Sequence, residues 1–245
     1  MEDFIYWSSD ESIFAYLAIN EIQFFEISNP ETPIHRLKID NLQSFSMNSV
    51  SRCVCAYASG KKNEPSFIRL IQYPNINNSL ANKSFFNADR VEYKWNRSGN
   101  NLLLLCNTET SQNSYYGDST LHQIRANGET QLIQLSKKGP IYDLSWNPIR
   151  DEFIVVYGTM PAKATLFNNK GESIYDFGTG SRNEIFFNPH GNLVALAGFG
   201  NLRGIIEIWN LNTSNKVPQK LTDFLADDTT FFEVLIYMIF RKQNA

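Results

Sequence analysis

Basic side chains gather in the second half of the sequence, and their chemistry could serve recognition. They are Lys137, Lys138, Lys163, Arg182 and Arg203, with the aromatic Phe199 between the last two. Ammonium and guanidinium groups bind phosphate or carboxylate oxygens, and an exposed aromatic ring stacks on bases. The pattern therefore predicts a contact with an RNA backbone or with an acidic protein. Scattered surface charge is the alternative, and Asp227 and Asp228 would weaken the cluster if they enter a neighbouring loop.

No residue pattern supports catalysis or the binding of a metal or cofactor. The three histidines, His35, His122 and His190, lie far apart in the sequence. The glycines between Gly198 and Gly204 resemble a phosphate-binding loop, but a strand-like run follows them instead of the helix that such a loop needs. We interpret this segment as a hairpin turn, and we expect a protein that is not an enzyme and uses no cofactor.

Composition narrows the class of protein further. The chain has 245 residues and a formal net charge of −3, so no overall positive field attracts nucleic acid or anionic membranes. The cysteines, Cys53, Cys55 and Cys106, are too few for a disulfide framework and are expected to be buried free thiols. The apolar run at 231–240 is interrupted by Glu233 and is too short to span a bilayer. With no recognisable signal peptide, we expect a cytoplasmic protein without membrane partners.

The basic loops connect short alternating strands that repeat along the chain. A large residue closes the first strand of each repeat, and an apolar run begins seven residues later. The closing residues are Trp7, Met47, Trp95, Trp146 and Phe187, with Phe232 opening a partial sixth repeat. This spacing, together with the absence of helical periodicity, is typical of an all-β, WD-like β-propeller with about five four-stranded blades.

Antiparallel connectivity predicts where the basic loops lie within such blades. The loop between the second and third strands lies at the same end of a blade as the loop that leads to the next blade. Lys137, Lys138, Lys163, Arg182 and Arg203 fall in four consecutive loops of these two kinds. We therefore expect their side chains to project from one face, with Phe199 among them.

Several segments of the sequence resemble the propeller of the eukaryotic translation initiation factor 2A family. They are PSFIRLIQYPN (65–75), SLANKSFFNADRV (79–91), SYYGDSTLHQIRANGE (114–129), MPAKAT, YDFGTG, NPHG and LAGFGNLRG. The resemblance implies a non-catalytic factor that binds the small ribosomal subunit and assists delivery of initiator tRNA. It also implies mRNA and other initiation factors as partners, and it makes the basic cluster a candidate RNA or ribosome contact. A generic WD-type interaction scaffold unrelated to translation is the alternative.

The family propeller is larger than five blades, so we expect this chain to form an incomplete ring. Residues 1–230 are expected to form the blades as a single domain, and residues 231–245 a divergent apolar tail outside the resemblance. This tail combines high β-propensity with little charge, which is the profile of an aggregation-prone edge. We therefore expect it to promote self-association.

Overall fold

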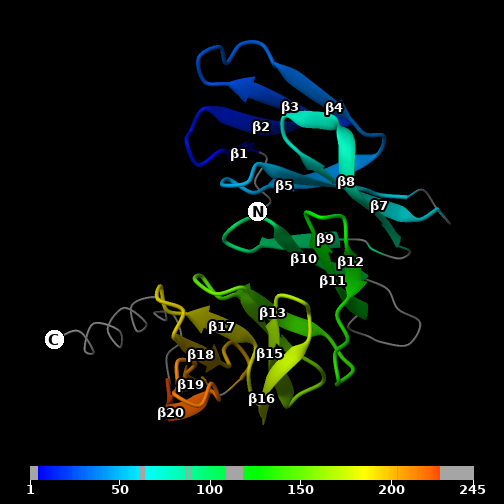
Figure 1. Ribbon diagram of the computed structural model, residues 1–245. Helices are drawn as coiled ribbons and strands as arrows, with labels where there is room; N and C mark the ends of the chain where they lie inside the picture. The colour runs from blue at the N-terminus through cyan, green and yellow to red at the C-terminus, as the bar shows by residue number, and fades with distance from the viewer. Residues whose placement is uncertain are drawn as a thin grey trace. The chain divides into compact units, whose positions relative to one another are not determined.

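The structure, a computed structural model, describes residues 5–60, 64–85, 88, 90–108, 118–202 and 204–226. All regular secondary structure in these ranges is β-strand (Figure 1), which confirms the predicted all-β class. None of the described residues belongs to a helix long and apolar enough to cross a membrane. The chain divides into two compact units, Met1–Ile133 and Gln134–Ala245. The predicted tail at 231–245 and the partial sixth blade lie outside the described residues.

The first unit contains three four-stranded antiparallel sheets, each built from consecutive strands. The first sheet consists of β1 (Ile5–Trp7), β2 (Ile13–Ala18), β3 (Glu21–Glu26) and β4 (His35–Lys38). The second consists of β5 (Leu42–Met47), β6 (Cys53–Ala58), β7 (Ser66–Gln72) and β8 (Asn75–Phe85). The third consists of β9 (Arg90–Trp95), β10 (Asn101–Thr108), β11 (Asp118–Arg125) and β12 (Thr130–Leu132).

The second unit contains two sheets of the same kind. One consists of β13 (Ile141–Trp146), β14 (Glu152–Tyr157), β15 (Ala162–Asn168) and β16 (Ser173–Gly180). The other consists of β17 (Glu184–Phe187), β18 (Leu193–Ala197), β19 (Ile205–Asn210) and β20 (Gln219–Leu225). The five predicted blades are thus confirmed, and each predicted closing residue ends the first strand of its sheet. No sheet in the described ranges combines strands from both ends of the chain.

The second strand of most sheets is apolar throughout because both of its faces are buried. In β6, Val54 and Ala56 pack toward the first sheet, whereas Cys55 and Tyr57 pack toward the third. Strands β14 and β18 are likewise buried along nearly their whole length. The sequence of a strand covered on both faces is a continuous apolar run instead of an alternating one. The cysteines are buried and free, as predicted, and burial raises the pKa of Cys106 to about 12.

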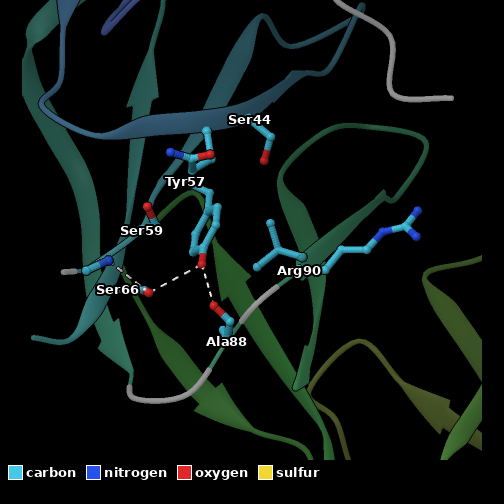
Figure 2. A pocket seen from close by; sticks show the side chains of 9 residues that line it. Ser44, Tyr57, Ser59, Ser66, Ala88 and Arg90 are labelled. Atoms are coloured by element: carbon cyan, nitrogen blue, oxygen red, sulfur yellow. Dashed lines mark hydrogen bonds between the residues drawn. The ribbon is translucent and has the colours of Figure 1, made fainter. Parts of the chain in front are cut away.

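The second and third sheets are joined by both apolar and polar contacts. Figure 2 shows the Tyr57 hydroxyl donating to the carbonyl of Ala88, at 2.6 Å, in the segment that leads to the third sheet. The indole of Trp95 donates to the hydroxyl of Ser46 at 3.0 Å. Trp95 therefore packs between neighbouring sheets.

A buried imidazole lies in the third sheet. His122 is 8% exposed and stacks on Phe85 with 5.8 Å between ring centroids. Its Nδ1 has no hydrogen-bond partner among the residues that the structure describes. Burial lowers the pKa of His122 to about 4, and the charge of Lys83 acts in the same direction. The ring is therefore neutral at physiological pH.

This burial predicts a pH dependence of stability. An unfolded histidine takes up its proton near pH 6.5, whereas folded His122 does so only near pH 4. Between these values the unfolded state binds more protons, so the stability that neutral His122 supports is lost as pH falls. We expect His122→Gln to flatten the decline in urea midpoint between pH 6.5 and 4. His190→Gln, which removes an exposed imidazole, should retain the parent slope, and equal slopes for both variants would contradict the argument.

A polar residue caps the first turn of every sheet. The capping residues, one directly after each first strand, are Ser8, Asn48, Asn96, Asn147 and Asn188. In each case the backbone amide of this residue donates to the carbonyl of the residue five positions later. Its side-chain oxygen accepts amide hydrogens inside the same turn. Four of the five capping residues, all except Asn48, are buried, and their bonds satisfy backbone amides of the turn within the protein.

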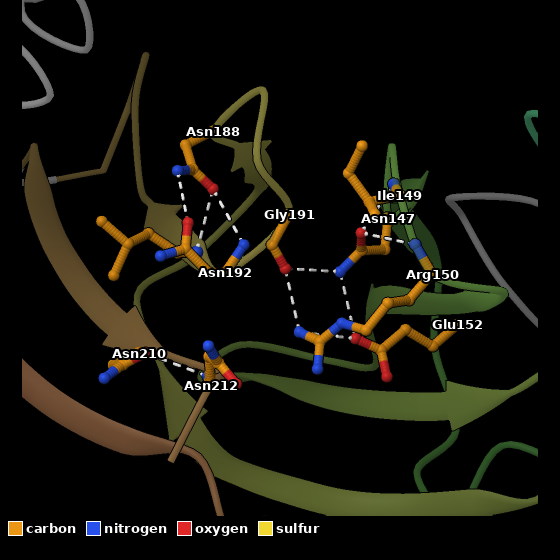
Figure 3. A network of polar contacts seen from close by, with 10 residues as sticks. Asn147, Ile149, Arg150, Glu152, Asn188, Gly191, Asn192, Asn210 and Asn212 are labelled. Carbon is orange, nitrogen blue, oxygen red and sulfur yellow. Dashed lines mark hydrogen bonds and ion pairs between the residues drawn. The ribbon is translucent and has the colours of Figure 1, made fainter.

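Within each unit, such a turn is also bonded to the turn of the following sheet. Figure 3 shows this link in the second unit, where the carbonyl of Gly191 accepts from Asn147 Nδ2 at 2.8 Å and from Arg150 at 2.9 Å. In the first unit, the hydroxyl of Ser51 donates to the carbonyl of Gly99 at 3.0 Å. The turns therefore fix neighbouring sheets to one another at this end.

The link at Gly191 predicts a stability defect. A Cβ added to Gly191 would lie 2.1 Å from Asn147 Oδ1 at a backbone φ of +62°. That oxygen cannot move away, since it accepts from the amides of Ile149 and Arg150. Gly200 has a similar φ of +70° but open space around it. Gly191→Ala should therefore cost about 2 kcal/mol more than Gly200→Ala in urea unfolding, and equal costs would contradict the link.

Candidate nucleic-acid interface

The loops that carry the predicted basic residues meet at one end of the second unit. Residues 134–140 lead into β13, residues 158–161 join β14 to β15, and residues 181–183 join the two sheets. The amide of Thr159 donates to the carbonyl of Lys138 at 3.1 Å. We call this region the basic end, defined by residues 134–140, 158–163, 181–183 and 198–202. The predicted topology of these loops is confirmed.

The three lysines of the basic end differ in their surroundings. Lys138 is exposed, whereas the ammonium group of Lys137 donates to the carbonyl of Pro161 at 2.6 Å. Lys163 lies at the start of β15 and pairs with Asp176 of β16 at 2.8 Å. That hydrogen bond raises the pKa of Lys163. Lys138 is thus the cation most available to a partner, and Lys163 would have to exchange its partner to bind another anion.

Arg182 does not project from the face, so its predicted placement is wrong. The residue is 4% exposed, and its guanidinium pairs with Glu207 of β19 at 2.7 Å. The same group donates to the carbonyls of Phe177 and Gly178 at 3.2 and 3.1 Å. The side chain therefore joins the two sheets internally, because three acceptors of the protein itself surround it.

Phe199 is also buried, which contradicts its predicted role as an exposed stacking ring. It is 7% exposed and belongs to an apolar cluster on β18 and β19. Its ring centroid lies 6.5 Å from that of Phe186. The loop is held in place by Asn183, whose side-chain oxygen accepts from the amide of Phe199 at 2.9 Å. Arg203, the remaining predicted contact, lies outside the described residues.

Sequence reasoning missed the acids that meet these cations, because neither Asp176 nor Glu207 lies in a loop. Glu207 also approaches the ammonium group of Lys220 at 3.6 Å. Burial acts to raise the pKa of Asp176, but the hydrogen bonds from Lys163 and from the amide of Gly178 outweigh it, and the pKa is lowered. One signal was present in the sequence: Glu207 is the single charged residue in the apolar strand IIEIWN. Such a charge usually has an internal partner.

The difference between the two ion pairs can be measured. Arg182→Ala leaves the carboxylate of Glu207 in a largely buried place, so it should lower the free energy of unfolding by about 3–5 kcal/mol. Lys163→Ala removes a half-exposed pair and should cost at most about 1 kcal/mol. Urea denaturation of both variants tests this order. Equal losses would show that Arg182 does not serve as the internal link.

Comparison with known proteins identifies the family. A family model described as eukaryotic translation initiation factor eIF2A matches residues 83–234. The chain is 41% identical over 238 residues to eukaryotic translation initiation factor 2A of Drosophila melanogaster, and 35% identical over 232 residues to that of Schizosaccharomyces pombe. Both alignments cover 93% of this chain, but only 37% and 40% of the relatives.

A solved structure agrees with this assignment. The crystal structure of a eukaryotic initiation factor superposes with a TM-score of 0.82 at 33% identity, covering 93% of this chain and 54% of that chain. The chain thus spans less than half the length of the curated relatives and about half of the solved one. Its five sheets correspond to propeller blades, and the chain belongs to the eIF2A family of translation initiation factors.

Proposed function

We propose that this chain acts in translation initiation as a non-catalytic scaffold that binds the small ribosomal subunit and assists the delivery of initiator tRNA. The observation that carries the proposal is the family match over residues 83–234. Messenger RNA and other initiation factors are further partners that such a role would bring near. The role also places the protein in the cytoplasm, where ribosomal subunits initiate translation.

The placement of the basic residues supports a ribosome contact through the basic end. Lys138 is exposed, and Lys163 lies on a strand start beside the loop that packs against Lys138. With a net charge of −3, the chain has no general affinity for RNA, so a local group of cations has to supply it. A WD-type scaffold unrelated to translation would have no need of this contact.

The scaffold role is supported by how the polar side chains are used. The buried asparagines cap turns, Arg182 joins two sheets, and His122 is held neutral inside the third sheet. Each of these groups has a place in the packing of the fold. The surfaces left for partners are therefore the loops at the sheet ends, which suits binding instead of catalysis.

Co-sedimentation with purified small ribosomal subunits tests the proposal. The variant Lys138→Glu with Lys163→Gln should weaken binding and lower the slope of log affinity against log salt concentration by about 2. The control is Lys170→Glu with Lys216→Gln, which makes the same change in net charge in turns at the opposite end of the two sheets. It should bind like the parent.

Two results would count against the proposal. If the parent chain does not sediment with the subunit at physiological salt, ribosome binding by this part of the family is wrong and the generic scaffold is favoured. If both double variants bind as the parent does, the subunit contact lies away from the basic end. Arg182 is left unchanged in these variants, since its loss would alter the fold.

A further inference from the structure

The first unit contains a crevice between its second and third sheets that the proposed function does not use. It has a volume of about 310 Å³ and lies where β6 runs into β7 and where β8 leads to β9. Its lining includes the side chains of Gln43, Ser44, Ser59, Ser66 and Arg90 around the ring of Tyr57 (Figure 2). The volume is at the lower end for small-ligand sites, so it admits a small molecule or one residue of a polymer.

The floor of the crevice is rigid. The Tyr57 hydroxyl donates to the carbonyl of Ala88 at 2.6 Å and lies 3.3 Å from the hydroxyl oxygen of Ser66, which accepts from the amide of Gly60 at 3.1 Å. At the other side, the hydroxyls of Ser44 and Tyr93 lie 2.8 Å apart and link the two sheets. A ligand would therefore enter a preformed site and would not have to order these groups.

A break in strand pairing shapes one wall of the crevice. The pairing of β5 with β6 shifts between Leu42 and Ser44, so Gln43 has no partner in the ladder. Such a bulge changes the direction in which neighbouring side chains point and is common beside binding sites. Its effect here is that both Gln43 and Ser44 line the crevice.

Arg90 and Ser59 supply side-chain groups that the described residues do not bind. Arg90 is exposed, and within the described ranges its guanidinium makes neither an ion pair nor a hydrogen bond. The Ser59 hydroxyl likewise has no hydrogen bond to a described residue. Figure 2 shows the Arg90 side chain extending outward from the start of β9, away from the Tyr57 hydroxyl. None of the described residues that line the crevice is acidic.

This arrangement matches the chemistry of a nucleotide. A guanidinium at the rim of a site binds a phosphate by charge-assisted hydrogen bonds. The hydroxyl and amide side chains of the lining can both donate to and accept from ribose hydroxyls, which distinguish RNA from DNA. The crevice also lies at the sheet end formed by connections of the same kind as those of the basic end.

We propose that the crevice holds one nucleotide of single-stranded RNA, with its phosphate on Arg90 and its ribose against Ser59 and Gln43. The choice of RNA over another phosphate-bearing partner rests on the proposed function. The inference that the crevice is a binding site comes from its geometry alone and does not depend on the proposed function. It would add a second RNA contact to the chain, in a unit that carries none of the predicted basic residues.

Fluorescence anisotropy with a labelled single-stranded uridine decamer tests the site. Arg90→Ala should raise the dissociation constant by about tenfold, since a charge-assisted contact is lost. Ser59→Leu, which fills the crevice and keeps the charge, should also weaken binding. The matched control is Arg97→Ala, which removes an exposed arginine from the turn at the opposite end of the same sheet and should leave affinity unchanged. The urea midpoint of each variant verifies that it remains folded.

The outcomes separate this inference from the proposed function. If the folded variants Arg90→Ala and Ser59→Leu bind the decamer as the parent does, RNA binding in the crevice is wrong, even if the parent chain sediments with ribosomal subunits. Loss of decamer binding in both variants supports RNA binding in the crevice, even if the parent does not sediment with ribosomal subunits. Arg90-dependent binding of a phosphoserine peptide, with no affinity for the decamer, would overturn RNA as the occupant and indicate a phosphoprotein. Equal affinity for the matching DNA would overturn the ribose contact.

Discussion

The polar capping residue that follows the first strand of each sheet is the constraint on which the rest of the fold depends. By holding the turn at one length, it fixes which residue of the second strand lies opposite each residue of the first. A shift by one position would turn every side chain of the second strand to the wrong face. In β6 such a shift would exchange the residues that pack toward the first and third sheets. The cap therefore determines the register that the core requires.

Two ion pairs of the second unit differ in how exposed their side chains are to solvent. Arg182 and Glu207 are nearly excluded from solvent, with side chains 5% and 12% exposed, and they form part of the contact between two sheets. Lys163 and Asp176 are more exposed, at 22% and 50%. The first pair is costly to break because it would leave an uncompensated charge inside the protein. The second is weakened by water and salt, so its lysine remains accessible to exchange.

Much of the fold could be predicted from the sequence because its signals are local. The residues that close first strands, such as Trp95 and Trp146, precede turn residues at a regular distance, and both the strand order and the shared end of the loops follow from that repeat. The burial of Arg182 and Phe199 could not be predicted in this way. Their burial depends on Glu207 and on Phe186, which reach them only through the pairing of β17, β18 and β19.

The crevice was missed for a related reason. Arg90 begins the third sheet, whereas Ser59 lies in a connection of the second, and both are ordinary residues in their own segments. No spacing along the chain indicates that they share a site, since only the packing of two sheets brings them together. Sequence periodicity predicts which elements form and in what order. It does not predict which polar side chains remain open once neighbouring sheets have packed.

The first and second connections of each sheet differ in how much their lengths vary. Every connection from a first to a second strand has five residues, from 8–12 in the first sheet to 188–192 in the last. Connections from second to third strands range from two residues at 19–20 to nine at 109–117. Extra residues there disturb neither a capped turn nor the register of a buried strand. The connections between second and third strands are therefore the natural position for grafting a foreign peptide or an affinity epitope, with the capped first turns left unchanged.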